Sequence, residues 1–286
     1  GLHPTAGCAR ICRLHAAGFA NGAASGASHF RFPFLCLPQV VGPTATPACR
    51  RTLIHAPSIS ARLWLLPPLL FLLGAPLWLQ LFEPALFISI NTLCAPVVAP
   101  FWTGLSLLGN AWGVLAVTSP LLVRAPRLLW AWLCAAPFAI LFARLGKGLI
   151  ESPRPVAVVD HTQVRVVGEL LHNVSMPSGH TLTAFAVASG LYFSLPVQGR
   201  TKHLWLFVLA AGAGLSRIAV GAHWPGDVVV GASLGLLAGM LGNRLLLARM
   251  ASKHLQPTSW SLRLVAGLMG ATLVALLVEP QDFDEN

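Results

Sequence analysis

Long apolar stretches separated by short polar connections dominate the chain from residue 63 onward. A helix needs about 20 consecutive apolar residues to cross the hydrocarbon core of a bilayer. The pattern therefore predicts an all-α, polytopic membrane helical bundle with spans at 63–82, 103–123, 128–146, 180–196, 204–221, 227–248 and 262–278. The segment 85–101 is also apolar, but Pro96 and Pro100 interrupt it. We expect this segment to lie along the interface or dip into it rather than to span.

The composition divides the chain into three parts. Residues 1–60 are rich in Ala, Gly, Pro, Ser and Arg and have no sustained periodicity, which predicts a basic, disordered tail. This tail is either an extension without function or an organelle transit peptide. Residues 61–250 hold six of the predicted spans, and residues 251–286 hold a linker, the seventh span and an acidic C-terminus.

Charged residues are scarce and unevenly placed. Only 10% of the 286 residues are charged and 55% are hydrophobic. A soluble domain has about 25% charged residues, so a soluble chain is excluded. The chain carries 19 Lys+Arg and 9 Asp+Glu, a net charge of +10. Because the basic residues accompany apolar spans, we expect an anionic membrane face and phosphate-bearing substrates as partners, and no nucleic acid.

The basic residues also predict the orientation. Three connections hold basic residues and no acid: Arg124 and Arg127, then Arg200 and Lys202, then Arg244, Arg249, Lys253 and Arg263. The positive-inside rule places these connections and the tail in the cytoplasm. The loop 147–180 and the turn 217–227 then face outward, which in a bacterium is the periplasmic face of the inner membrane. A span at 85–101 would invert this orientation.

The two outward segments hold ionisable groups at the edges of apolar spans, where such groups are costly unless they have a function. Lys147, Arg154 and Arg217 are cations suited to phosphate oxygens. The run Ser-Gly-His at 178–180 is expected to begin a helix, with the serine as its cap and free first-turn N–H groups that favour an anion.

His223 and Asp227 are expected to act as a pair. Pro225 favours a helix start, which puts Asp227 in the first turn and His223 just before it. The carboxylate then accepts the Nδ1 proton of His223, and Nε2 points outward as a nucleophile. A single basic residue such as Lys147 or Arg154 is better explained as a membrane anchor, and a single histidine as a structural residue. Their occurrence together, in three ordered segments, favours one site.

These segments resemble the type-2 phosphatidic acid phosphatase (PAP2) family, whose site is related to that of vanadium haloperoxidases. The family pattern is K-x6-RP, then PSGH, then SR-x5-H-x3-D. It is matched by Lys147, Arg154, Pro155, Pro177, Ser178, Gly179, His180, Ser216, Arg217, His223 and Asp227. The match covers 147–227, and the span pattern extends it over about 63–248 as a six-helix core.

The resemblance implies a role for each matched residue. His223 attacks phosphorus and forms a phosphohistidine, Asp227 orients it, and His180 protonates the leaving group and then activates water. The phosphoryl oxygens are bound by Lys147, Arg154, Arg217 and the backbone of Ser178 and Gly179. The implied enzyme is a metal-independent, cofactor-free hydrolase of a lipid phosphate or lipid pyrophosphate.

Two other functions stay open. One is a noncatalytic lipid-phosphate binder or transporter on the same fold, although intact histidines argue against it. The other is a haloperoxidase, whose relatives are soluble, so the apolar spans argue against it. Phosphatidic acid, phosphatidylglycerol phosphate, undecaprenyl diphosphate and a lipid A phosphate are all compatible with the sequence, as is any oligomeric state.

Two minor patterns complete the sequence. Asn173-Val174-Ser175 matches the N-glycosylation pattern, and we interpret this as a chance match. Trp102, Trp205 and Trp224 are interpreted as interfacial anchors, and Trp224 also adjoins His223.

Overall fold

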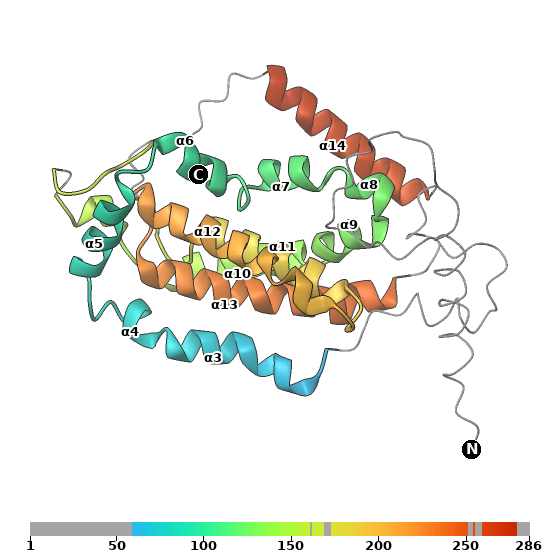
Figure 1. Ribbon diagram of the computed structural model, residues 1–286, viewed down its shortest axis with the longest axis horizontal. Helices are drawn as coiled ribbons and strands as arrows, with labels where there is room; N and C mark the ends of the chain where they lie inside the picture. The colour runs from blue at the N-terminus through green and yellow to red at the C-terminus, as the bar shows by residue number, and fades with distance from the viewer. Residues whose placement is uncertain (1–58, 161, 169–172, 251–253, 255–258, 279–286) are drawn as a thin grey trace, which may run out of the picture. The chain divides into compact units, whose positions relative to one another are not determined.

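The computed structural model describes residues 59–160, 162–168, 173–250, 254 and 259–278, and within these residues every regular element is helical (Figure 1). The N-terminal tail and the acidic C-terminal end predicted from the sequence lie outside the described residues. The elements are η1 (Ala61–Leu65), α3 (Leu66–Leu73), α4 (Ala75–Trp78), α5 (Ala85–Cys94), α6 (Ala99–Ser106), α7 (Ala111–Thr118), α8 (Leu121–Arg124), α9 (Pro126–Leu133), α10 (Ala136–Leu149), η2 (Pro155–Ala157), α11 (Gly179–Ser194), η3 (Arg200–His203), α12 (Trp205–Ala219), α13 (Pro225–Leu241), η4 (Gly242–Leu246), η5 (Leu247–Arg249) and α14 (Trp260–Val278).

Helices α11 and α13 pack side by side, and α12, α10 and α9 lie against this pair (Figure 1). Glycines on α13 permit the close approach. A β-carbon at Gly231 would collide with the carbonyl of Ser178, and one at Gly235 with the carbonyl of Leu182. Small residues four apart let two helix backbones come together in a membrane. The packing brings the N-terminal ends of α11 and α13 next to each other.

Two of the described helical segments are long and apolar enough to cross a membrane, Pro126–Leu149 and Pro225–Arg249. They contain the predicted spans 128–146 and 227–248. The other predicted spans correspond to shorter or interrupted helices in the described part of the chain, and 103–123 is divided among α6, α7 and α8. The count of six spans plus a seventh therefore stays a prediction.

The segment 85–101 is bent rather than straight. Helices α5 and α6 meet at 113° across a short break, so the pair is either one broken span or a re-entrant loop. Pro96 lies in the break, where proline cannot donate a helical hydrogen bond. The interruption expected from the two prolines is thus present, and it redirects the chain at this point.

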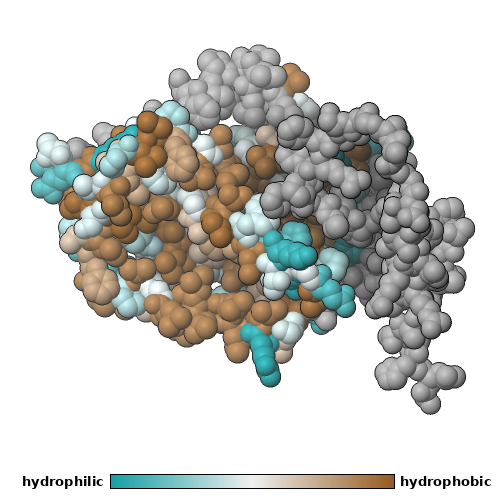
Figure 2. All heavy atoms as spheres, viewed as in Figure 1, coloured by the Kyte–Doolittle hydropathy of each residue, from teal (hydrophilic) through white to brown (hydrophobic). Residues whose placement is uncertain are grey.

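Apolar side chains cover most of the coloured part of the face seen in Figure 2, which is formed by described residues. Leu72, Leu73, Val123 and Val208 are examples of large apolar residues that are mostly exposed. Extended apolar surface of this kind is rare on soluble monomers and marks contact with a membrane or a partner. Together with the two long apolar helices, this surface indicates a membrane protein.

Candidate active site

The two predicted helix starts are present and are capped as expected. Helix α11 begins at Gly179, and the Ser178 Oγ accepts hydrogen bonds from the Thr181 N–H at 3.4 Å and from the Thr181 hydroxyl at 2.9 Å. Helix α13 begins at Pro225, and Asp227 lies in its first turn. Free N–H groups at a helix start attract negative charge. The starts of α11 and α13 lie next to each other, since the Ser178 N–H donates to the Asp227 carbonyl at 3.1 Å.

His223 and Asp227 form the predicted pair. The His223 Nδ1 lies 3.3 Å from the Asp227 Oδ2, and both residues are buried. The Trp224 N–H also donates to this Oδ2, at 2.9 Å. On the other side of the ring, Nε2 lies 3.4 Å from the Arg154 Nη1. Because arginine can only donate, Nε2 is the acceptor and Nδ1 carries the ring proton.

Burial determines the protonation state of His223. Burial is the largest cause lowering the pKa of this imidazole, the hydrogen bond and charge of Asp227 raise it, and the positive charges of Arg154 and Arg217 lower it, so that the pKa lies at about 4. The ring is therefore neutral at neutral pH. A neutral imidazole with its proton on Nδ1 has a free lone pair on Nε2, which is the form that a nucleophile needs.

The three predicted cations come from three elements. Arg154 follows α10 and is buried, and its Nη1 donates to the Ala222 carbonyl at 2.9 Å. Arg217, at the end of α12, is fully buried and donates from Nη1 to the Ser106 Oγ at 3.0 Å. Lys147 lies in the last turn of α10 and is half-buried. Burial and the charge of Arg217 lower the pKa of Arg154 to about 10, so it remains charged at neutral pH.

His180 lies close enough to the three cations and His223 to interact with them electrostatically. Its ring lies in the electrostatic field of Arg217, His223, Arg154 and Lys147. The structure therefore brings the predicted nucleophile, the second histidine and all three cations to one place at the start of α11. Groups of like charge gathered in this way need an anionic partner, and a phosphoryl group is the anion that arginine forks suit.

The backbone N–H groups of Ser178 and Gly179 differ in whether a protein acceptor is available to them. The Ser178 N–H donates to the Asp227 carbonyl at 3.1 Å, so this donor is used within the protein. Gly179 is the first residue of α11, where no intrahelical acceptor exists for an N–H group. A β-carbon at Gly179 would meet no protein atom within 4 Å, which leaves space beside it.

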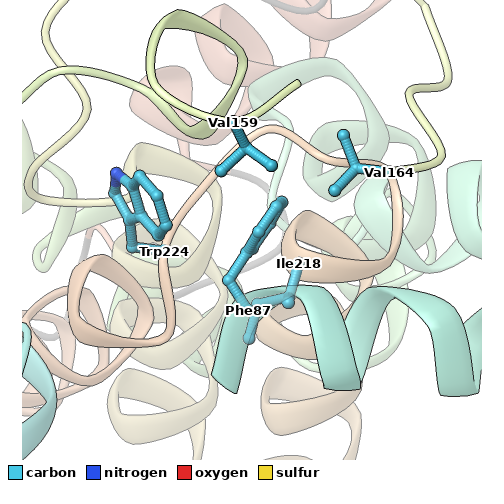
Figure 3. Close-up of a cluster of buried hydrophobic side chains, with 5 residues drawn as sticks. All are labelled: Phe87, Val159, Val164, Ile218 and Trp224. Atoms are coloured by element: carbon cyan, nitrogen blue, oxygen red, sulfur yellow. The ribbon is translucent and has the colours of Figure 1, made fainter. Parts of the chain in front are cut away.

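Trp224 directly follows His223, the predicted nucleophile, and is buried. Its indole N–H donates to the Pro153 carbonyl at 2.7 Å, and its ring packs edge-on against Phe87 of α5. Figure 3 shows Phe87 and Trp224 together with Val159, Val164 and Ile218, a cluster that joins the loop between α10 and α11 to α5 and α12. Trp224 and Trp102 are buried, so the anchor role expected for them is wrong, whereas Trp205 is exposed.

Sequence reasoning missed several residues that contact this site. Asn173 accepts from Arg154, Ser175 donates to Asp227, and Ser106 accepts from Arg217. Ser106 and Ser175 are far from their partners along the chain. The one available signal was that Asn173 and Ser175 lie just before the Pro-Ser-Gly-His run.

Comparison with known proteins identifies the class of this site. Residues 127–251 match the model of the PAP2 superfamily. The chain is 33% identical to the decaprenylphosphoryl-5-phosphoribose phosphatase of Mycobacterium tuberculosis over 146 residues, which are 48% of this chain and 75% of that protein. The chain belongs to the PAP2 superfamily.

Two further relatives complete the comparison. The lipid A 1-phosphatase of Porphyromonas gingivalis is 40% identical over 68 residues, which are 24% of this chain and only 15% of that protein. The crystal structure of Aquifex aeolicus LpxE has 27% identity and a TM-score of 0.49, and the match covers 56% of this chain and 93% of that one. The relatives named as phosphatases support assigning the chain to the phosphoric ester hydrolases.

Proposed function

We propose that this protein is an integral-membrane phosphatase that hydrolyses a lipid phosphate or lipid pyrophosphate through a phosphohistidine on His223. The observation that carries the proposal is the orientation of His223, with Nδ1 on Asp227 and Nε2 beside Arg154, next to His180. The relatives named as phosphatases of lipid A and of a decaprenyl phosphoribose support a lipid-linked substrate.

The first step forms the covalent intermediate. The Nε2 lone pair of His223 attacks phosphorus in line, and the bond between phosphorus and the leaving oxygen breaks. His180 transfers its proton to that oxygen as a general acid. The phosphorylated ring is positively charged, and the carboxylate of Asp227 at its Nδ1 stabilises that charge.

The second step releases phosphate. His180, now neutral, removes a proton from water as the oxygen of that water attacks phosphorus. The bond between phosphorus and Nε2 breaks, and inorganic phosphate leaves with the neutral His223 ring restored. Both steps use the same two histidines, so loss of either one stops the cycle.

The phosphoryl oxygens are bound by Lys147, Arg154, Arg217 and the Gly179 N–H. The charges of Arg154 and Arg217 are buried and held by hydrogen bonds before the reaction, which makes them effective in stabilising the transition state. Three cations supply the compensation that a divalent ion supplies in other phosphoryl-transfer enzymes. The proposed reaction is therefore independent of added metal.

The proposed site opens to the outer, periplasmic face of a bacterial inner membrane. This orientation follows from the basic connections that the positive-inside rule assigns to the cytoplasm. A lipid head group would then enter from the outer leaflet, with its tails remaining among the apolar helices. The assay described next identifies the substrate lipid and distinguishes a phosphate monoester from a pyrophosphate.

The test is a phosphate-release assay on purified protein in detergent, with phosphatidic acid, phosphatidylglycerol phosphate, undecaprenyl diphosphate and lipid A as substrates. We expect release from at least one lipid in the presence of EDTA. His223→Ala should abolish this activity, and His203→Ala, a histidine of η3 outside the site, should retain it.

Each outcome has a clear reading. Full activity in His223→Ala would overturn the phosphohistidine mechanism, and activity lost with EDTA would overturn metal independence. Lipid-phosphate binding without release in the wild-type protein would favour the noncatalytic alternative.

A further inference from the structure

The short segment Asn173-Val174-Ser175 contacts both halves of the active site. We infer that it is a positioning element, in which Ser175 orients the His223–Asp227 pair and Asn173 orients the phosphate-binding Arg154. This inference rests on the proposed function. It also gives the apparent glycosylation pattern another explanation, because the side chains of the exposed Asn173 and the buried Ser175 are both hydrogen-bonded to residues of the site.

Ser175 touches both members of the nucleophile pair. Its hydroxyl donates to the Asp227 Oδ2 at 2.5 Å, and its oxygen lies 3.3 Å from the His223 Nδ1. The hydrogen of the hydroxyl is used by the carboxylate, so the oxygen lone pairs face the Nδ1 proton. That proton therefore has two acceptors, Asp227 and Ser175, both 3.3 Å from Nδ1. Two acceptors hold the ring in one orientation and one tautomer.

The Asp227 carboxylate depends on this contact. Its Oδ1 is buried and has no hydrogen-bond partner among the described residues. The orientation of the carboxylate thus rests on Oδ2, which is approached by the Ser175 hydroxyl, the Trp224 N–H and the His223 ring. The Ser175 contact is the shortest of the three.

Bulk water is unable to replace the Ser175 hydroxyl, because Ser175 has 0% exposure. Its backbone is also fixed, since the Ser175 N–H donates to the Ser152 carbonyl at 2.9 Å. Removing one partner of a buried hydrogen bond leaves the other unsatisfied, which is the costly case. Here the Asp227 carboxylate would lose the shortest of its hydrogen bonds and keep only those with the Trp224 N–H and the His223 ring.

Asn173 performs the corresponding task for Arg154. The Arg154 Nε donates to the Asn173 Oδ1 at 2.6 Å and approaches its carbonyl at 3.3 Å. The Ala222 carbonyl accepts from the Nη1 of the same guanidinium. These contacts fix the plane of the arginine fork, and fork geometry determines how well it binds phosphate oxygens.

The test compares Ser175→Ala and Asn173→Ala with the wild type in the phosphate-release assay. The matched control is Ser152→Ala, because the Ser152 hydroxyl is buried in the same region and has no hydrogen-bond partner among the described residues. We expect Ser175→Ala to lower kcat by about 10- to 100-fold with KM changed less, as for other residues that orient a reacting group. Asn173→Ala should mainly raise KM.

A pH profile separates positioning from damage to the fold. Without the Ser175 hydroxyl, the Asp227 carboxylate loses a donor and attracts the Nδ1 proton of His223 more strongly, and this charged group outweighs the loss of the neutral Ser175 oxygen as an acceptor. The acid limb of kcat/KM should therefore move to higher pH. Arg154, Arg217 and His180 also face this ring and are unchanged in the variant. A fold defect would lower the amount of active enzyme without moving the limb, and thermal unfolding in detergent measures it directly.

An active wild type with unchanged kcat and acid limb in Ser175→Ala overturns the inference and leaves the proposed function standing. Equal losses in Ser175→Ala and Ser152→Ala also overturn it. A wild-type protein that releases no phosphate from any lipid overturns the proposed function and this inference together.

Discussion

The protonation state of His223 depends on opposing influences of its surroundings on the pKa of the ring. Burial and the charges of Arg154 and Arg217 disfavour a proton on the ring, and Asp227 favours one. Burial and the two arginines together have the larger effect, so the pKa of His223 lies at about 4, below the ordinary value of 6.5. Asp227 therefore orients the ring without keeping it protonated, which leaves a nucleophilic lone pair in the neutral pH range.

This balance predicts the pH dependence of the free enzyme. As the pH falls through about 4, the ring takes up a proton, the Nε2 lone pair is lost and kcat/KM declines. At pH values above this, the nucleophile stays active. The measurement is kcat/KM for phosphate release across acidic buffers of constant ionic strength. An acid limb near 6.5, the value of an exposed histidine, would contradict the prediction.

The bend between α5 and α6 is linked to the rest of the fold by hydrogen bonds of the buried Asn91 and of Arg165. The Asn91 side chain donates to the carbonyls of Arg165 at 3.0 Å, Ile218 at 3.0 Å and Ala219 at 3.2 Å, and it accepts from the Arg165 N–H at 2.8 Å. The Arg165 guanidinium in turn donates to the carbonyls of Ala95 and Val97, in the bend itself, at 2.7 Å each. Asn91 thus joins α5, the loop between α10 and α11 and the end of α12.

Loss of this cluster should destabilise the fold. We expect Asn91→Ala to lower the free energy of unfolding by about 2–4 kcal/mol, because several backbone groups lose their partner in a buried position. Thermal unfolding in detergent measures the change. Thr92→Ala, an exposed neighbour on the same helix, is the control and should have little effect. Equal stability of Asn91→Ala and the wild type would show that the cluster does not hold the bend.

On the scale of the whole molecule, charge is separated from the apolar surface. The described helices expose large apolar side chains, whereas Arg154, Arg217, His180 and His223, which are proposed to contact phosphate, are buried near the starts of α11 and α13. Basic residues lie in the connections that are predicted to be cytoplasmic. We therefore propose two uses of positive charge, one for membrane orientation and one for substrate binding.

The orientation is testable with reporter fusions. A reporter that is active only in the cytoplasm should give a signal when fused at Arg200. A reporter that is active only outside the cytoplasm should give a signal when fused in the 156–170 loop. The reason is the positive-inside rule, with 85–101 not crossing the membrane as a straight span. The opposite pair of signals would mean that 85–101 spans and that the proposed site faces the cytoplasm.

The sequence by itself determined those features that depend on neighbouring residues. Pro225 starts α13, Ser178 caps α11, and His223 and Asp227 meet because they are four residues apart at a helix start. Helix starts, caps and apolar period are local properties, so they are readable without a partner. The superfamily pattern is local in the same sense, because each of its three pieces is short.

Only the tertiary structure decided which distant groups complete the site. Ser175 reaches Asp227 across 52 residues, and Ser106 reaches Arg217 across 111. Serine and asparagine are common in loops and caps, so their type alone indicates no partner. The bend at 95–98 and the close contact of α11 with α13 likewise depend on packing between segments far apart in sequence. Long-range hydrogen bonds and close helix contacts have no local pattern, and the folded chain alone brings them together.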